Sequence, residues 1–332
     1  MTRSKASSAP RRLFVKATAT LALTAACSGA WAQGAWPNKP IRVVVPYGAG
    51  SSPDVIMRIV AERLAPRLGQ PVVVENRAGA GGNIGAAAVA KATDGHTLLM
   101  ASGSILTVNP HLYATLPFDP KKDFAAITNV ATGPMVVAVP PQSEVRNLEG
   151  LVAKAKASPG KVNFGSAGPG SQVHMASERL AVTLGVDLTH IPYKGESAAL
   201  TDLMAGQVDV VVGNIGAATP LVTGGKLRAL AVTSATRTRM LPEVPTVAES
   251  GYPGFENSGW FGLLAPAGTP QAAIDRVHKD TVAVLAMPDV VGRLQGLGMQ
   301  GVGNAPSALA AAIDAESKVW AEVVKARRLK AN

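Results

Sequence analysis

Over most of its length the chain repeats one pattern of apolar and polar positions. A continuous run of β-branched residues leads into a loop of glycines and hydroxyl residues, and the loop leads into a segment with apolar residues at helical spacing. The run Ile41–Val45 is too short and unbroken for an amphipathic helix, so it predicts a strand buried on both faces. Residues 53–68 predict the next helix, with Ser52 as N-cap, Pro53 at the first helical position and Gly69 after its end.

The same pattern continues through two further strands. Residues 71–76 (PVVVEN) and 96–102 (HTLLMAS) predict strands. Between them lies a glycine loop at 78–85, followed by a predicted helix at 86–92. This order is β-α-β-α-β, which predicts a sheet with right-handed crossovers.

A second set of elements begins near Thr132–Pro134 with the apolar run 135–140 (MVVAVP). The expected elements are a helix from 148 that stops at Pro159, a strand, loop and helix over 161–180, a strand, short helix and strand over 189–214, and a buried strand at 226–234. The strand, loop and helix order of the first half therefore recurs in the second.

The stretch 258–268 (SGWFGLLAPAG) predicts a return of the chain to the first half, on which the helices from Gln271 onward are expected to pack. We therefore predict an α/β protein of two domains joined by two crossover strands. Domain 1 would comprise residues 33–133 and 259–332, and domain 2 residues 134–258. In such folds the ligand lies in the cleft, where the carboxyl ends of strands face helix N-termini.

Residues 1–32 have the pattern of an export signal. Basic residues without any acid precede a small apolar run at 17–26, and the sequence AWA that ends at Ala32 has the form of a signal peptidase site. The apolar run is too short to span a membrane. We therefore expect cleavage near Ala32 and a soluble periplasmic protein. The segment Pro10–Lys16 also fits a twin-arginine signal, so the export route stays open.

Charge and cysteine content exclude several classes of protein. The formal net charge of +10 falls to +5 (10 − 5) when the five basic residues of the signal are removed. No cluster of Lys and Arg with interleaved aromatics remains, which argues against nucleic-acid binding, and a mild positive field suits a small anion. The single cysteine, Cys27, lies in the signal, so disulfides, thiol nucleophiles and Cys-ligated metals are not expected. The preceding residues leave a lipidated form at Cys27 open.

The loops do not carry the motifs of common enzymes. Ser51, Ser52 and Ser166 lack the glycines two residues before and after a hydrolase nucleophile, although scattered histidines leave a triad in space open. The run 79–85 breaks the dinucleotide pattern at Ile84, and no phosphate-binding P-loop occurs. Because paired metal ligands are also missing, we expect no cofactor, no metal and no enzymatic activity.

Three loops instead combine backbone N–H groups with small hydroxyls at the starts of helices. They are Tyr47–Asp54, Ser166–Ser171 and Tyr193–Ser197. Helix N-termini of this kind bind anions, and a carboxylate can accept several of their hydrogen bonds without any catalytic group. The loops therefore predict binding without turnover.

Six segments in order carry a resemblance to a known family. They are WPNKPIRVVVPYGAGSSPDVIMR, VVVENRAGAGGNIGAAAVAKATDGHTLLM, NPHLYATLPFDPKKDFAAI, GKVNFGSAGPGSQVHMASERL, HIPYKGESAALTDLMAGQVDVVVGNI and LRALAVTSATRTRMLPEVPTVAESGYPGFENSGWFGLLAPAGTP. On these segments the chain resembles the extracytoplasmic substrate-binding receptors of the tripartite tricarboxylate transporter system, the Bug or TctC family. The resemblance implies a type II-like periplasmic-binding-protein clamp with its ligand in the interdomain cleft.

The resemblance also implies a set of ligand-binding residues. They are Tyr47, Gly48, Ala49, Ser51, Ser52 and Asp54 in the first loop, Ser166, Gly170, Ser171 and His174 in the second, Tyr193 and Lys194 in the third, and Asn214 after VDVVVG. The first loop departs from the family form, because Gly48 and Ala49 stand in place of two prolines and Ser51 in place of a glycine. Gly213 stands where an Asp is common in relatives.

Several of these residues allow two interpretations. Asp54 either contacts the ligand or complements the helix dipole, His174 either contacts the ligand or makes structural hydrogen bonds, and Lys194 is either a counter-charge or a solvated turn residue. The glycines at 79–85 are expected to allow close packing of loops. Ser51, Ser166 and Ser171, with their neighbouring amides, are the preferred contacts.

The resemblance implies a receptor that closes around a small carboxylated molecule and delivers it to integral membrane permease subunits. The closing hinge is expected at Thr132–Met135 and Ser258–Phe261. We expect a monomer. The alternative is a periplasmic sensor of the same fold, which the sequence does not separate from a transport receptor. Dicarboxylates, tricarboxylates, acidic amino acids and aromatic acids all stay open as ligands.

Overall fold

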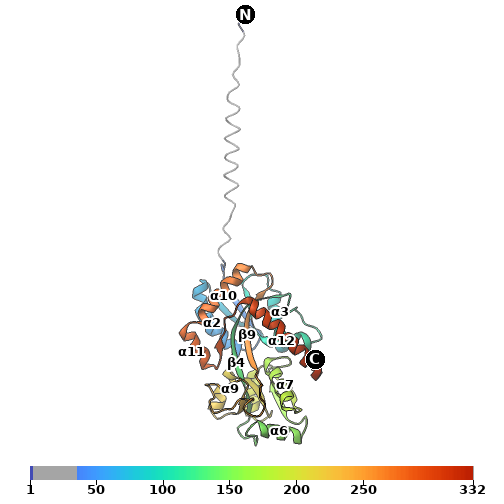
Figure 1. Ribbon diagram of the computed structural model, residues 1–332. Coiled ribbons are helices and arrows are strands. Elements are labelled where there is room, and N and C mark those ends of the chain that lie inside the picture. The colour runs from blue at the N-terminus through green and yellow to red at the C-terminus, as the bar shows by residue number, and fades with distance from the viewer. Residues whose placement is uncertain (3–35, 332) are drawn as a thin grey trace. The chain divides into compact units, whose positions relative to one another are not determined.

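One long strand, β4 (Phe124–Val139), belongs to two regions of sheet. Its first part pairs antiparallel with β9 (Ser258–Pro266), and its last residues pair antiparallel with β7 (Val211–Asn214) and β8 (Arg228–Val232). The computed structural model describes residues 1–2 and 36–331, and in it β4 and β9 run side by side (Figure 1). The predicted pair of crossover strands is therefore confirmed.

The described part of the chain begins after the predicted export signal. The expected cleavage near Ala32, the twin-arginine segment and Cys27 lie outside the described residues. Residues 39–332 form a single compact unit. Within the described residues, none of the helices combines the length and the apolar character required to cross a membrane.

The first sheet region has the strand order β10-β4-β9-β3-β1-β2. Its strands β1 (Ile41–Val45), β2 (Val72–Asn76) and β3 (Thr97–Ser102) are parallel, while β9 runs antiparallel to β3. The short β10 (Gln300–Gly301) closes one edge beside β4. This arrangement confirms the predicted β-α-β-α-β order.

The helices of the first region follow the sequence pattern with small shifts. Helix α2 (Ser52–Leu68) starts one residue earlier than expected, so its N-cap is Ser51 and not Ser52. It ends as predicted at Gly69, which has φ 73°, a value that favours glycine. Helix α3 (Asn83–Ala90) starts before the predicted 86, because residues 80–82 form a 3₁₀ turn, η2 (Ala80–Gly82), that shortens the glycine loop.

Two short helices and three C-terminal helices complete this region. The short helices, α4 (Gly103–Thr107) and α5 (Asn109–Leu112), were not predicted. The C-terminal helices are α10 (Gln271–Leu285), α11 (Pro288–Gly296) and α12 (Pro306–Arg327). Helix α10 contacts α2 through Arg67, which pairs with Asp280 at 3.2 Å. The predicted packing of the C-terminal helices on the first half is confirmed.

The second region repeats the alternation of strands and helices. Its elements are α6 (Leu148–Ala157), β5 (Asn163–Ser166), α7 (Gln172–Leu184), β6 (Thr189–Pro192), α8 (Glu196–Met204), β7, α9 (Ile215–Thr223) and β8. Strands β5 and β6 form a parallel pair. In Figure 1, α6, α7 and α9 gather around the end of β4 that pairs with β7 and β8.

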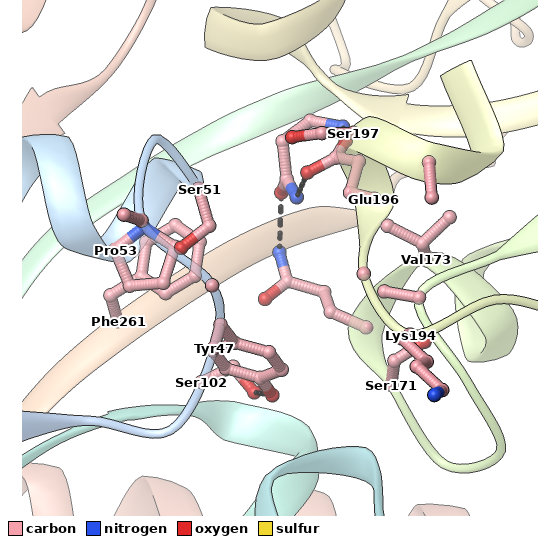
Figure 2. Close-up of a pocket in the computed structure, with 17 residues that line it drawn as sticks. Tyr47, Ser51, Pro53, Ser102, Ser171, Val173, Lys194, Glu196, Ser197 and Phe261 are labelled. Atoms are coloured by element: carbon pink, nitrogen blue, oxygen red, sulfur yellow. Dashed lines mark hydrogen bonds between the residues drawn. The ribbon is translucent and has the colours of Figure 1, made fainter. Parts of the chain in front are cut away.

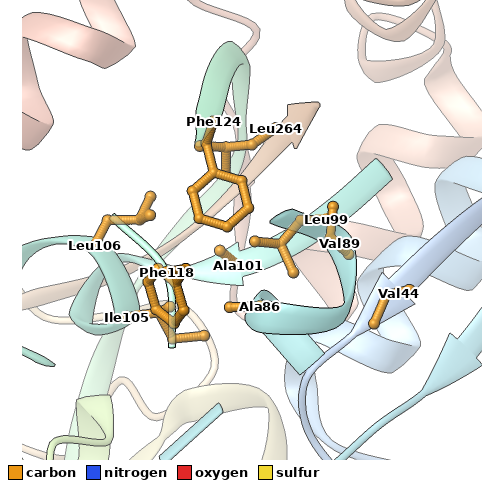
Figure 3. Packing of buried hydrophobic residues seen from close by; sticks show 10 residues of the cluster. All are labelled: Val44, Ala86, Val89, Leu99, Ala101, Ile105, Leu106, Phe118, Phe124 and Leu264. Carbon is orange, nitrogen blue, oxygen red and sulfur yellow. The ribbon is translucent and has the colours of Figure 1, made fainter. Parts of the chain in front are cut away.

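An apolar core lies under the first region and supports the candidate site. Phe118 and Phe124 meet edge to face with ring centroids 5.6 Å apart, and Leu99 and Leu264 pack with them (Figure 3). Burial of each such side chain contributes roughly 1.5–3 kcal/mol. Tyr47 packs against this cluster, so the loop that follows β1 rests on a rigid base.

Candidate functional site

A cavity of about 230 Å³ lies where loops of the two regions face each other (Figure 2). Tyr47, Ser51 and Pro53 lie on one side of it. The other side carries Ser171 and Lys194 among its lining residues. The volume corresponds to roughly seven liquid water molecules, which suits a ligand with on the order of ten non-hydrogen atoms.

Five helix N-caps line this one cavity. They are Ser51 of α2, Ser102 of α4, Ser171 of α7, Gly195 of α8 and Asn214 of α9. The first N–H groups of a helix have no partner within the helix, and the partial positive charge there favours an anion by about 0.3–1 kcal/mol per helix. The cavity therefore combines apolar lining residues such as Pro53, Val173 and Phe261 with helix N-termini that favour an anion.

Seven of the thirteen residues predicted from the sequence line the cavity. They are Tyr47, Gly48, Ala49, Ser51, Ser171, Lys194 and Asn214. The other six, Ser52, Asp54, Ser166, Gly170, His174 and Tyr193, are not among the lining residues. Direct ligand contact by any of the thirteen stays a prediction, and the contacts of the six within the protein are described below.

The first loop is held in shape by Asp54. The residue is 2% exposed, and its carboxylate accepts hydrogen bonds from Gly50 N at 2.9 Å, Arg58 Nε at 3.0 Å and Asn76 Nδ2 at 3.0 Å. Burial alone would raise the pKa of Asp54, but the hydrogen bonds from Arg58, Gly50 and Asn76 together lower it below its ordinary value. Asp54 is thus ionised, and its hydrogen bonds hold the loop in its conformation.

The two adjacent serines of this loop differ in position. The hydroxyl of Ser51 is buried, has no hydrogen-bond partner and belongs to a residue that lines the cavity. The hydroxyl of Ser52 is also buried without a partner, but Ser52 lines a small separate cavity beside Gly216 and Met299. Ser51 therefore has a free hydroxyl beside the ligand cavity.

Tyr47 forms a wall between the loop and the core. Its hydroxyl shares a short hydrogen bond with Ser102 Oγ, which in turn is 3.0 Å from Ser104 Oγ. Burial raises the pKa of Tyr47 to about 12, although the hydrogen bonds of both serines oppose this shift. Tyr47 is therefore neutral and serves as a hydrogen-bonding group rather than a charge.

Behind the second loop lies a stack of aromatic rings. The rings of His174 and His190 are 4.0 Å apart, and Phe164 stacks on His190 at 4.9 Å. Ser166 Oγ is hydrogen-bonded to His190 Nε2. Burial, together with the nearby His174, lowers the pKa of His190 to about 3, so its ring is neutral at physiological pH.

His174 and Gly170 support the loop from within. His174 Nδ1 accepts a hydrogen bond from Gly170 N at 3.1 Å, and its Nε2 is 3.6 Å from Glu178 Oε1. The N-cap hydroxyl of Ser171 accepts from His174 N at 3.2 Å. These contacts match the structural alternative for His174. In the third loop, the Tyr193 hydroxyl donates to Asp202 at 2.8 Å.

Ten of the lining residues were not among the thirteen contacts predicted from the sequence. They are Pro53, Ser102, Ala167, Gln172, Val173, Gly195, Glu196, Ser197, Ala198 and Phe261. Several of these lie inside the three predicted loops or next to their ends, so the loops were found but not all of their inward side chains. Ser102 is the last residue of β3, and Phe261 is its antiparallel partner within β9, so only the three-dimensional fold brings both to the cavity.

Glu196, Asn214 and Gln172 form a chain of hydrogen bonds at the cavity wall, which Figure 2 draws as dashed lines. Asn214 donates through its backbone N to Glu196 Oε1 at 2.5 Å and through Nδ2 to Oε2 at 2.8 Å. Gln172 Nε2 donates to Asn214 Oδ1 at 3.1 Å. Burial raises the pKa of Glu196 to about 7, even though both bonds from Asn214 lower it.

The charged groups of the cavity are few. Lys194 and Glu196 are the ionisable side chains of opposite sign among the lining residues, and Lys194 is exposed whereas Glu196 is 7% exposed. Within residues 1–2 and 36–331, no group of three or more His, Cys, Asp or Glu side chains is placed to hold a metal ion.

Solved structures that share this fold include a periplasmic binding protein. The periplasmic binding protein BugD is 37% identical, with a TM-score of 0.84 over 89% of this chain and 99% of that chain. A Rhodopseudomonas palustris protein solved with adipate is 34% identical (TM-score 0.84; 87% of this chain, 97% of that chain). MatC from the same organism with bound malate is 32% identical (TM-score 0.83; 87% and 100%).

Sequence comparison gives the family. Residues 56–329 match the tripartite tricarboxylate transporter family receptor, TctC. A protein from the tcbD–tcbE intergenic region of a Pseudomonas species is 41% identical over 97% of this chain and 96% of its own length. BugT of Bordetella pertussis is 39% identical over 87% and 90%. The chain therefore belongs to the TctC family of periplasmic receptors, and it is a solute-binding receptor rather than an enzyme.

Proposed function

We propose that this protein binds a small carboxylate in the cavity and delivers it unchanged to a membrane transporter. The observation that carries the proposal is the meeting of five helix N-caps, from both sheet regions, around one cavity. Similar receptors have been solved with adipate and with malate, and carboxylates of that size fit the cavity volume. Permease subunits as partners follow from the family.

We also propose that closure occurs about the two crossing strands. Gly133 of β4 stands opposite Gly259 of β9, and Pro134 stands opposite Ser258, at the point where pairing with β9 ends. The next residue of β4, Met135, already pairs with Asn214 of β7. This change of partner supports domain limits of 33–133 with 259–332 and of 134–258.

Export is proposed to remove residues 1–32. The family is periplasmic, which agrees with a signal that ends near Ala32. Mass determination of the exported chain checks the cleavage position. Replacement of Arg11 and Arg12 by lysines separates the routes, since export by the twin-arginine pathway stops and export by the general pathway continues.

The ligand proposal is tested on the purified protein with malate, adipate, aspartate and benzoate. Native mass spectrometry identifies any molecule that co-purifies, and calorimetry measures the dissociation constant of each acid. A ligand at a hundredfold excess over its dissociation constant adds about 2.7 kcal/mol to the free energy of unfolding. Recovery of unaltered acid after prolonged incubation supports a receptor. Absence of stabilisation by every carboxylate, or consumption of the acid, contradicts the proposal.

A further inference from the structure

The Glu196–Asn214–Gln172 chain ends on a group without a partner. Gln172 lines the cavity, and its Oε1 is buried and accepts no hydrogen bond among the described residues. An acceptor left unsatisfied in a buried position is unfavourable. Its partial negative charge lies just behind the wall of the cavity in which an anionic ligand is expected. The chain in its present direction is therefore unsuited to a carboxylate.

The direction of the chain depends on the protonation of Glu196. The backbone N–H of Asn214 cannot reverse, so Glu196 Oε1 is always an acceptor. A proton on Glu196 is therefore better placed on Oε2, opposite the side-chain amide of Asn214, because the carbonyl oxygen is the stronger acceptor for the backbone N–H. Rotation of that amide by half a turn makes its oxygen the acceptor for Oε2–H, because amide oxygen and nitrogen occupy nearly the same space.

The reversal continues to Gln172. After this rotation Asn214 Nδ2 faces the side chain of Gln172. Gln172 then turns its own amide, so that its Oε1 accepts a hydrogen bond from Asn214 Nδ2. The unpaired acceptor disappears, and the NH₂ group of Gln172 is left free as a donor. A donor at the cavity wall suits a carboxylate, whereas an acceptor opposes it.

The surroundings leave Glu196 free to exchange one proton. Of the elements packed on α8, β5 and β7 present no ionisable side chain, and α7 contributes only the uncharged Gln172 and Val173 to the cavity. The remaining ionisable lining groups are Tyr47 and Lys194, and Asp202 of α8 is hydrogen-bonded to Tyr193. The carboxyl of Glu196 is packed closely, since a methyl group at Gly213 would lie 3.1 Å from its Oε1.

We propose that Glu196 is a specificity-determining residue whose protonation reverses the Asn214 and Gln172 amides, so that the cavity takes up one proton from solvent together with a carboxylate ligand. This inference rests on the proposed function, which places a carboxylate in the cavity. It makes the receptor selective for an acid plus one proton over the bare anion.

Calorimetry of malate and adipate in two buffers of different ionisation enthalpy counts the protons taken up on binding. At pH 8 we expect uptake that approaches one proton, and at pH 6 only a small fraction of one, because Glu196 is then already mostly neutral while malate and adipate are still mostly ionised. Affinity should fall by up to tenfold per pH unit above neutrality. Glu196→Gln holds an amide donor permanently opposite Asn214, so we expect no uptake and the same affinity at both pH values. Glu149→Gln, an exposed residue of α6, should behave like the unaltered protein.

A second variant tests the path through Gln172. Gln172→Met removes the terminal amide at similar length, so proton uptake on binding should disappear although Glu196 still titrates. Undiminished uptake in Gln172→Met, or any uptake in Glu196→Gln, overturns the inference while leaving carboxylate binding intact.

The ligand-free protein provides an independent measurement. The carboxyl ¹³C signal of Glu196, identified by its absence in Glu196→Gln, should titrate with a midpoint near pH 7. A midpoint near 4.5, the ordinary value for Glu, overturns the inference even if no acid binds. A complete absence of acid binding instead contradicts the proposed function.

Discussion

Gly259 of β9 lies directly against the side chain of Gln172. A methyl group on the α-carbon of residue 259 would come within 1.4 Å of Gln172 Nε2 and 3.3 Å of Asn214 Oδ1. The crossing strand therefore forms a close-fitting support for the polar chain at the cavity wall. A residue far from the cavity loops in sequence thus determines where Gln172 can lie.

Gly259→Ala should weaken ligand binding without unfolding the protein. The added methyl group displaces the flexible end of Gln172, and loss of one such hydrogen-bonding group costs about 0.5–1.5 kcal/mol, or roughly two- to tenfold in affinity. Calorimetry with the best acid ligand measures the change. Gly268→Ala, where no atom lies within 4 Å of the added methyl group, is the matched control. Equal affinity in the two variants would contradict the structural role of Gly259.

Ser51→Ala and Ser52→Ala should differ in their effects on binding but have similar effects on stability. Both hydroxyls are buried without partners, so their removal should leave the free energy of unfolding unchanged or raised by up to about 1 kcal/mol. Only Ser51 lines the cavity. We therefore expect a roughly two- to tenfold weaker ligand affinity for Ser51→Ala alone. A loss of affinity in Ser52→Ala as well would show that the loop rather than the hydroxyl is responsible.

Asp54→Asn should loosen the first loop. The neutral amide cannot accept all three hydrogen bonds made by the carboxylate, and hydrogen bonds to a charged group are worth about 1.5–3 kcal/mol each in stability. We expect the free energy of unfolding at pH 7 to fall by roughly 2 kcal/mol, as measured in urea. Asp289→Asn removes an exposed pair with Arg63 and should cost much less stability, because solvent screens exposed ion pairs.

Asp54 also gives stability a pH dependence in acid. Its folded pKa lies below the ordinary value of 3.8, so its contribution is present above that pH and is lost as the pH falls through the folded pKa. The Asp54→Asn protein should lack this part of the decrease in free energy of unfolding at acid pH. If the stabilities of the two proteins fall in parallel below pH 3.8, the lowered pKa of Asp54 is contradicted.

Glu196 should give stability the opposite pH dependence to Asp54. Its folded pKa of about 7 lies above the ordinary 4.5, so its favourable contribution is complete below pH 4.5 and is lost as the pH rises through 7. Each tenfold change in proton affinity is worth about 1.4 kcal/mol, so the whole contribution is roughly 3 kcal/mol. The stability of Glu196→Gln relative to that of the unaltered protein should therefore be greater at pH 8 than at pH 5. Urea unfolding measures the free energy of unfolding of both proteins at both pH values. If the difference between the proteins is the same at pH 8 and pH 5, the raised pKa of Glu196 is excluded.

The fold was predictable because its local signals are strong. Buried runs such as Ile41–Val45 and terminating residues such as Gly69 mark strands and helix ends directly. The first part of β4 was not predicted, because Thr128, Asn129 and Gly133 interrupt its apolar pattern. In the structure Thr128 Oγ1 donates to Asn304 O at 2.7 Å, a tertiary contact that no local pattern reveals.

The cavity was predictable at the level of loops but not of side chains. The glycine and hydroxyl loops before helices indicated Ser51 and Ser171 as ligand contacts, and both line the cavity, although the N-cap of α2 was expected one residue later, at Ser52. Glu196 gave no comparable signal, because an acid in the first turn of a helix is ordinary. Its role depends on Asn214, 18 positions away, and that pairing exists only after β7 is placed beside α8.

The five N-caps give the cavity a property that matters for its evolutionary history. Every residue except proline supplies a peptide N–H group, so most point mutations at these helix starts leave the basic affinity for an acid in place unless they disrupt the fold. Gene duplicates can consequently exchange the few inward side chains and acquire new nutrients in single steps, while each intermediate still holds some organic anion.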